Sequence, residues 1–197
     1  PTPGEVVGLI RPIAADSLVE RDGARLALAA GTAAELQEGD GVSAGTGIDL
    51  SLGGGDRVRY DAAASGSVAA ARPERVILEL AGGRVYVDAA KRGDGRIFEV
   101  RTPIATAGIR GTRFVVDQGA DAVEVSVLEG KVAVWPNGRP DGVSVAGAGE
   151  SIRVERAAAA APPPGPMAAE GRSRYSRIFE AIWETDLGSG DPSARRR

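Results

Sequence analysis

The sequence predicts an all-β domain over residues 5–155, followed by a linker and one C-terminal amphipathic helix. The first observation is a series of short runs in which apolar and polar residues alternate, such as 76–80 and 122–127. Alternation at period two is typical of half-buried strands. The second observation is that Gly, Asp-Gly or Pro follows nearly every run, and these residues allow the backbone of tight turns. Short strands separated by such turns indicate a sandwich, a barrel or a β-solenoid.

The expected strands are spread over the whole domain. They comprise residues 26–28, 48–52, 76–80, 84–87, 96–100, 113–116, 122–127, 131–135, 142–145 and 151–154. Only 4% of the 197 residues are aromatic and 28 are Gly, so Val, Ile, Leu and Ala must fill the core. Small side chains favour a thin β-solenoid or β-roll, but no strict repeat period is visible that would select it.

The C-terminal part has a different character. At Ala157 the alternation gives way to five consecutive Ala residues and a Pro-rich stretch, which predicts a semi-rigid linker over 156–170. Residues 171–188 then predict an amphipathic helix, with Ser173 as a plausible N-cap. One stripe of this helix would hold Tyr175, Ile178, Phe179, Ile182 and Trp183. Residues 189–197 are expected to be a disordered tail.

The composition excludes several functional classes. The chain contains no His and no Cys, which removes Ser-His-Asp and Cys-His catalysis, disulfides, Fe–S clusters and ordinary zinc sites. We therefore expect no metal, no cofactor and no conventional enzyme activity. The net charge of −3 argues against nucleic-acid binding, which favours a basic surface. No apolar run reaches the ~20 residues that span a bilayer, so we expect only indirect membrane contact.

Residues 99–116 carry the most specific motif of the chain. Thr102-Pro103 is followed, after a short spacer, by Arg110-Gly111-Thr112-Arg113-Phe114. This combination resembles the signature of the FecR family of bacterial envelope proteins, in which a strand leads into Thr-Pro and then Arg-Gly-Thr-x-Phe. The signature residues are Thr102, Pro103, Arg110, Gly111, Thr112 and Phe114. Residues 125–132, a strand followed by Gly-x-Val, and residues 146–150, which end in Ala-Gly-Glu, also resemble segments of that family.

The resemblance implies a β-solenoid-like domain that faces the periplasm. In the best-known members this domain follows a transmembrane helix and a cytoplasmic anti-sigma segment, and it contacts the signalling domain of a TonB-dependent iron-siderophore transporter. This chain contains neither segment, so our main expectation is a non-enzymatic periplasmic or secreted scaffold that joins other envelope proteins, as a subunit of a complex or an oligomer. The alternative is the periplasmic sensor part of a FecR-type anti-sigma regulator. Because the chain starts at Pro1, we expect that either a signal peptide or a further part of the protein has been removed, and the periplasmic location assumes a signal peptide.

Two features of the signature have a functional and a structural interpretation. Some FecR-type sensors cleave themselves between Gly and Thr, and Gly111-Thr112 offers this pair. The structural alternative is a tight bend followed by a strand. Arg101, Arg110 and Arg113 could bind an anionic ligand or a partner carboxylate, or they could pair with neighbouring acidic residues on a solvated face.

The helical stripe is the predicted partner-binding site. Aromatic anchors on a helix are typical of docking into a groove of another protein. Two alternatives remain open from the sequence. The helix could fold back to cap the open end of its own β domain, or it could lie on a membrane surface, against which Glu180 and Glu184 argue.

Overall fold

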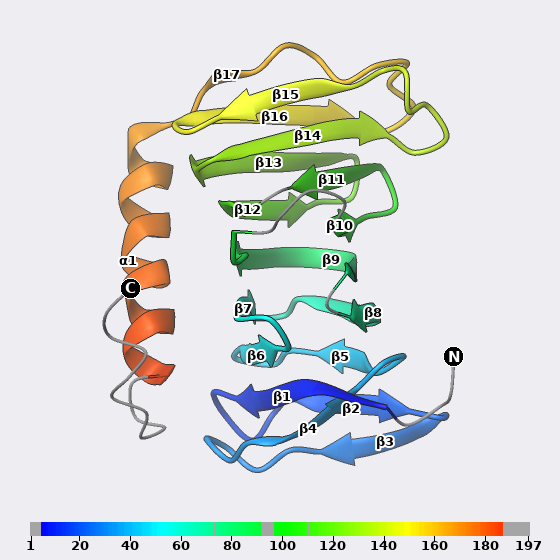
Figure 1. Cartoon of the computed structure of the whole chain (residues 1–197), viewed down its shortest axis with the longest axis vertical. Helices are drawn as coiled ribbons and strands as arrows, with labels where there is room; N and C mark the ends of the chain where they lie inside the picture. Colours follow the sequence, from blue (N-terminus) through cyan, green and yellow to red (C-terminus); the bar gives the residue numbers. More distant parts are fainter. Residues whose placement is uncertain (1–4, 73, 92–96, 110, 187–197) are drawn as a thin grey trace.

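The computed structural model describes residues 5–72, 74–91, 97–109 and 111–186. Over these residues the chain is mostly β-strand, with one C-terminal helix, α1 (Ala169–Asp186). The strands form two stacked ladders that are not closed into a barrel, here named sheet A and sheet B (Figure 1). The prediction of a β domain followed by a C-terminal helix is confirmed.

Sheet A holds the strands on the side of the helix. In spatial order they are β4 (Ala34–Gln37), β1 (Val6–Pro12), β6 (Ile48–Leu52), β7 (Asp56–Tyr60), the second part of β9 (Arg75–Asp88), β12 (Arg113–Gln118), β13 (Ala122–Glu129), β16 (Glu150–Glu155) and β17 (Gly165–Pro166). Each neighbouring pair in this ladder is antiparallel.

Sheet B lies on the opposite side of the core. Its order is β3 (Ala24–Ala27), β2 (Leu18–Arg21), β5 (Gly41–Ser43), β8 (Ser65–Arg72), the first part of β9, β10 (Ile97–Arg101), β11 (Ala105–Ile109), β14 (Lys131–Pro136) and β15 (Ser144–Gly147). The pairing of β9 with β10 is parallel, and the other pairings of this sheet are antiparallel.

Strand β9 belongs to both sheets. Its residues up to Gly82 pair with β8 in sheet B, and those from Gly83 onward pair with β7 and β12 in sheet A. Gly83 has φ +83°, and a Cβ built there would lie 2.7 Å from the Cα of Ala64. A side chain at this position would therefore be both strained and crowded, so the bend that carries β9 between the sheets requires glycine.

The core lies between the two sheets and follows the period of two. Val85 and Val87 on β9 point into it, as do Phe98 on β10 and Phe114 on β12, and all four are fully buried. Burial of such a side chain contributes about 1.5–3 kcal/mol. As the sequence predicts, aliphatic residues supply most of the core.

The segment read as a linker is attached to the upper end of the stack in Figure 1. The backbone N–H of Ala161 donates to the carbonyl of Gly142 at 2.9 Å, and the Ser144 hydroxyl donates to the carbonyl of Ala161, also at 2.9 Å. Ala161 is buried against the main core. Residues 165–166 then pair with β16 as β17. The helix therefore starts from an anchored point on the domain.

Candidate protein-binding site

Helix α1 lies along the outer face of sheet A, beside the stacked strands (Figure 1). Its apolar residues at positions 175, 178, 179 and 182 share one face because they are three or four residues apart. Phe179 and Ile182 are buried, with 3% and 6% of their surface exposed. The opposite face carries residues such as Arg177 and Glu180, which are exposed. The helix thus buries one face against its own domain.

The contact is an aromatic cluster that is separate from the main core. Tyr86 on β9 packs edge-to-face against Phe179, with ring centroids 5.9 Å apart, and against Tyr175, at 6.0 Å. Val115, directly opposite Tyr86 on β12, is also buried in this cluster, and Leu128 and Ile178 pack around it. We call this group the helix–sheet cluster. Edge-to-face geometry of this kind adds about 0.5–1.5 kcal/mol per pair beyond area burial.

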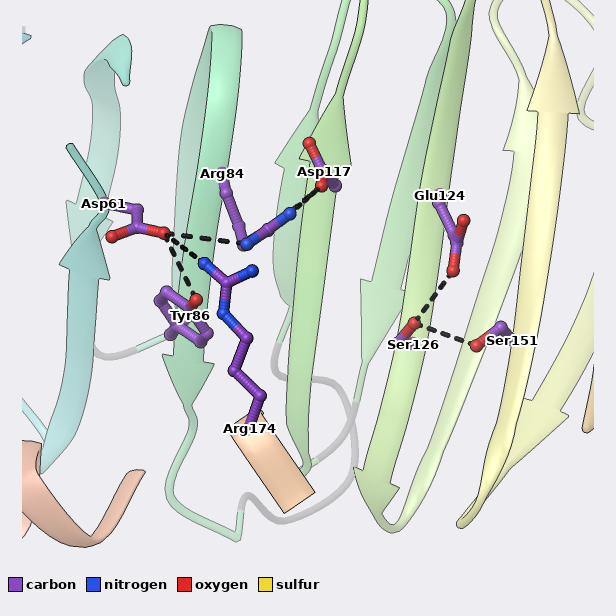
Figure 2. A network of polar contacts seen from close by, with 8 residues as sticks. All are labelled: Asp61, Arg84, Tyr86, Asp117, Glu124, Ser126, Ser151 and Arg174. Carbon is purple, nitrogen blue, oxygen red and sulfur yellow. Dashed lines mark hydrogen bonds and ion pairs between the residues drawn. The ribbon is translucent and has the colours of Figure 1, made fainter. Parts of the chain in front are cut away.

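A polar network surrounds the cluster (Figure 2). The carboxylate of Asp61 accepts the Tyr86 hydroxyl at 3.2 Å and lies 3.7 Å from the Arg84 guanidinium and 3.9 Å from that of Arg174. Arg84 also donates from Nε to Asp117 at 3.0 Å, across the pair of strands β9 and β12. Arg174 is on α1, so this network adds one ion pair between the helix and sheet A.

Burial sets the protonation of the two tyrosines. Burial raises the pKa of Tyr86, although the hydrogen-bonded Arg84 acts in the opposite direction. Burial likewise raises the pKa of Tyr175, and the guanidinium of Arg84 lies 5.7 Å from its ring centroid. A phenol with an ordinary pKa of about 10 is already neutral at physiological pH, and burial shifts both groups further in that direction. A neutral phenol packs in an apolar cluster without the cost of burying a charge.

Further along sheet A, two serines on neighbouring strands are in contact. The hydroxyls of Ser126 on β13 and Ser151 on β16 are 2.8 Å apart, and Ser126 lies 3.5 Å from the carboxylate of Glu124. Figure 2 shows this second group beside the first on the same sheet. Ser126 is buried, so its hydroxyl needs these partners.

The structure places four of the five predicted partner-binding residues together. Tyr175, Ile178, Phe179 and Ile182 contact the chain's own sheet A. The side chain of Trp183 lies outside the described residues. The helix covers the face of the sheet rather than the end of the stack. Docking of this stripe on another protein stays a prediction.

Sequence reasoning missed the receiving side of this contact. Tyr86 and Val115 lie in strands whose alternation predicts an outward position, so each reads as an ordinary surface residue. The one signal was an aromatic residue at an outward position of β9, next to Arg84. The network around Asp61 joins it to residues that are at least 23 positions away in the sequence, and periodicity cannot reveal such contacts.

The signature residues form turns and core contacts. The Thr102 hydroxyl donates to the carbonyl of Ala105 at 3.0 Å and accepts the N–H groups of Ile104 and Ala105 at 3.2 and 3.1 Å. It therefore holds the turn between β10 and β11 that begins at Thr102-Pro103. Phe114 is fully buried in the core. Arg110 lies outside the described residues.

The pair Gly111-Thr112 has a structural role. Gly111 has φ +75°, and a Cβ there would lie 2.6 Å from the Cα of Lys91. Thr112 is buried, and its hydroxyl donates to the carbonyl of Lys131 at 3.1 Å. A backbone carbonyl accepts this hydrogen bond but is too weak a base to remove the proton, which nucleophilic attack requires. This arrangement fits the structural interpretation, and self-cleavage stays a prediction.

The arginines near the signature lie on different sheets. Arg101 on β10 of sheet B pairs with Glu99 at 2.6 Å, and Arg113 on β12 of sheet A pairs with Asp88 at 3.1 Å. Both ion pairs fit the alternative in which these arginines pair with neighbouring acidic residues rather than bind a ligand. Among the described residues, no group of three or more His, Cys, Asp or Glu side chains is arranged to hold a metal ion. The same residues include no helix long and apolar enough to cross a membrane.

The outer face of sheet B is open. A groove of about 770 Å³ crosses its upper half, where Trp135 on β14 lies against Gly108 on β11, between Ile97 and Val145. A second groove, of about 650 Å³, lies lower on the same face and is lined mainly by small and acidic residues, among them Ser43, Ser67, Glu20 and Glu79. The two faces of the domain thus differ, since α1 lies on one and the other carries grooves.

These features define a β module with a helix on one face and grooves on the other. Residues 41–133 match the family model described as FecR protein. The resemblance carried by the signature is confirmed, and this part of the chain is a FecR domain. FecR proteins are associated with the bacterial envelope.

Solved structures show the same fold. Two crystal structures of a candidate anti-sigma factor from Parabacteroides distasonis ATCC 8503, at 1.65 and 2.50 Å resolution, each match with a TM-score of 0.57 at 21% sequence identity. The match covers 74% of this chain and 73% or 72% of theirs. At this identity the likeness is one of fold. A search among curated proteins gave no match.

Proposed function

We propose that this chain is the envelope-facing, partner-binding domain of a FecR-type signalling regulator. The observation that carries the proposal is the FecR match over residues 41–133, supported by the shared fold with a candidate anti-sigma factor over 74% of the chain. A regulator fits these two findings better than the generic envelope scaffold that our sequence analysis put first. The domain would act without catalysis, in the periplasm, by binding other proteins.

The architecture supports a β-roll reading of the fold. From β1 to β17 the chain passes repeatedly between sheet A and sheet B, with one or two strands in each sheet before it changes, and β9 itself crosses from one sheet to the other. Such a stack presents two long faces at a fixed distance. A rigid body with two faces suits a module that binds one protein on each side.

We place the regulated contact at α1. The helix–sheet cluster is separate from the main core and buries Phe179 and Ile182 as its two anchors from the helix. A partner with an apolar stripe of its own could replace α1 on sheet A, or could bind the stripe of α1 once it leaves. In either case the exchange involves Tyr86, whose ring contacts Tyr175 and Phe179.

Transcription tests the regulator. RNA sequencing would compare a strain lacking this gene, the same strain complemented with the gene, and the parent strain. We expect the deletion to change one discrete set of transcripts that depends on a single alternative sigma factor, with restoration by the complementing copy. An unchanged transcript profile under envelope stress and iron limitation would reject the regulator and leave the scaffold.

A truncation and two variants test the role of α1 in the same assay. Because residues 157–166 are attached to the stack, the chain should be cut after Met167 rather than at Ala157. Expression of the truncated chain and of F179A should alter the transcript set, since both uncover Tyr86. E180A, on the exposed face of the same helical turn, serves as the control and should behave like the unchanged gene.

A further inference from the structure

The two ends of the β stack are closed in different ways. At the end that carries β15 and β17, the segment that leads to the helix is attached to the stack, and its residues Ala161 and Met167 are buried. At the opposite end all four residues of β3 are exposed, and β3 pairs with β2 alone among the described strands. An open strand edge presents unpaired backbone groups to any other strand, and proteins usually cover or blunt such edges.

The edge of β3 has a defined hydrogen-bonding pattern. The N–H of Leu28 donates to the carbonyl of Ser17 at 3.4 Å, in line with the register in which Leu18 is opposite Ala27. In an antiparallel pair the bonded residues alternate along each strand. Positions 24, 26 and 28 therefore direct their backbone groups toward β2, while Arg25 and Ala27 direct theirs toward the free edge.

Both sheets end at the same level. Counting from the shared strand β9, sheet B continues through β8, β5, β2 and β3, and sheet A continues through β7, β6, β1 and β4. Strands β3 and β4 thus lie together at the lower end of the stack in Figure 1. A body that pairs with β3 in the plane of sheet B therefore meets β4 as well.

The open end also exposes apolar side chains. Leu26 on β3 is on the core side, opposite the buried Val19, yet it is 41% exposed because no further layer covers it. Leu28 and Ala34 are only partly buried against the same core. The open end of a second copy, which has the same two sheets at the same spacing, would continue this core.

We propose that β3 pairs with β3 of a second copy, about a two-fold axis through Leu26, so that sheet B continues across the dimer and the cores of the two copies meet. A two-fold axis perpendicular to the sheet keeps every side chain on its own face of the sheet. The axis must therefore pass beside a residue rather than between two residues, and the two residues nearest the middle of β3 are Arg25 and Leu26. An axis at Arg25 would set two guanidinium groups directly opposite each other, and like charges so placed are destabilising. The axis at Leu26 sets Leu26 against its copy and Arg25 against Ala27.

The favoured register also uses the free backbone groups. Arg25 and Ala27, which direct their N–H and C=O toward the edge, become a hydrogen-bonded pair with Ala27 and Arg25 of the other copy. Four backbone hydrogen bonds and the merged ends of two cores then join the subunits. A two-fold interface closes on itself, so both β3 edges would be paired in the dimer and neither would remain for a third copy.

Substitutions of Ala27 test this register. Ala27 is exposed, and only when the axis passes through Leu26 does it lie opposite Arg25 of the other copy. Analytical ultracentrifugation of the full chain over a concentration series, up to about 200 µM, should show a reversible dimer of the 20.1 kDa chain. With two symmetric charge pairs, A27E should tighten the dissociation constant by about 2-fold to 30-fold, and A27K should weaken it by the same factor. A27P removes the edge N–H and should give a monomer.

Circular dichroism of each variant would show that the β fold is retained. A monomer at every concentration would overturn the proposal. A dimer whose dissociation constant is the same in A27E and A27K would also overturn it, because the contact would then lie elsewhere. This dimer is independent of the proposed regulatory function, since neither its assay nor its outcome involves transcription or α1.

Discussion

Removal of the Phe179 ring should detach α1 and leave the β domain folded. Phe179 is 3% exposed and packs edge-to-face on Tyr86 at 5.9 Å. Loss of its burial costs about 1.5–3 kcal/mol, and loss of the aromatic pair about 0.5–1.5 kcal/mol more, so F179A should weaken helix docking by about 2–4.5 kcal/mol. A short amphipathic helix gains most of its stability from packing, and therefore this loss is enough to release it.

Native-state hydrogen exchange resolves this prediction by region. In F179A the amides of α1 should exchange close to the rate of an unstructured chain, while those of β9, β12 and β13 keep their protection. The exposed neighbour Glu180 provides a matched control, and E180A should exchange like the unchanged chain. If F179A lowers protection of the β strands as much as that of the helix, α1 is an integral part of the fold and our reasoning about a separable cluster is wrong.

Three further predictions concern pH and stability. Burial raises the pKa values of Tyr86 and Tyr175. The contribution of the two neutral phenols to helix docking is therefore complete below pH ~10 and is lost as pH rises through the folded-state pKa values. Hydrogen exchange of the α1 amides and tyrosine absorbance, measured at pH 8–12, should show the release of α1 from sheet A. D40N breaks a buried carboxylate pair with Arg21, whose guanidinium is 2.8 Å away, and should lower the free energy of unfolding in urea by about 2–4 kcal/mol. G83A should destabilise the domain by about 2–4 kcal/mol, since φ is +83° there, whereas G82A meets nothing within 4 Å and should change stability by about 0.5 kcal/mol or less.

Each of these predictions has an opposing outcome. Helix protection that is unchanged across the tyrosine titration would mean that the phenols do not govern docking. Unfolding of D40N at the same urea midpoint as the unchanged chain would mean that solvent screens the pair, although the Asp40 side chain is only 1% exposed. Equal stability of G83A and G82A would show that the bend of β9 tolerates a side chain.

The sequence predicted the strands better than their arrangement. Alternation at period two indicates which residues face the core, and it placed most of the strands from 48 to 154. It read 76–80 and 84–87 as two strands separated by a Gly-Gly turn, whereas the structure has the single strand β9. The reason is that glycine at positive φ permits a kink as readily as a reversal, and only the neighbouring strands decide between them.

Strand β11 was missed for a related reason. Its residues Ala105–Ile109 include two Ala and one Gly, which have low intrinsic preference for strands. Pairing with β10 and β14 on either side forms the strand instead. Tertiary contacts also explain why the helical stripe was found from the sequence while its binding face was not. A helix shows its buried stripe in consecutive turns, but the receiving surface is assembled from separate strands.

Because β9 is a single peptide segment shared by both sheets, neither sheet can be removed from the domain without disrupting the other. The strand runs from the groove face, where Glu79 lines the lower groove, to the helix face, where Tyr86 contacts α1. One covalent segment thus carries residues of both faces, so the two faces are joined by the backbone of β9 as well as by the packing of side chains between the sheets.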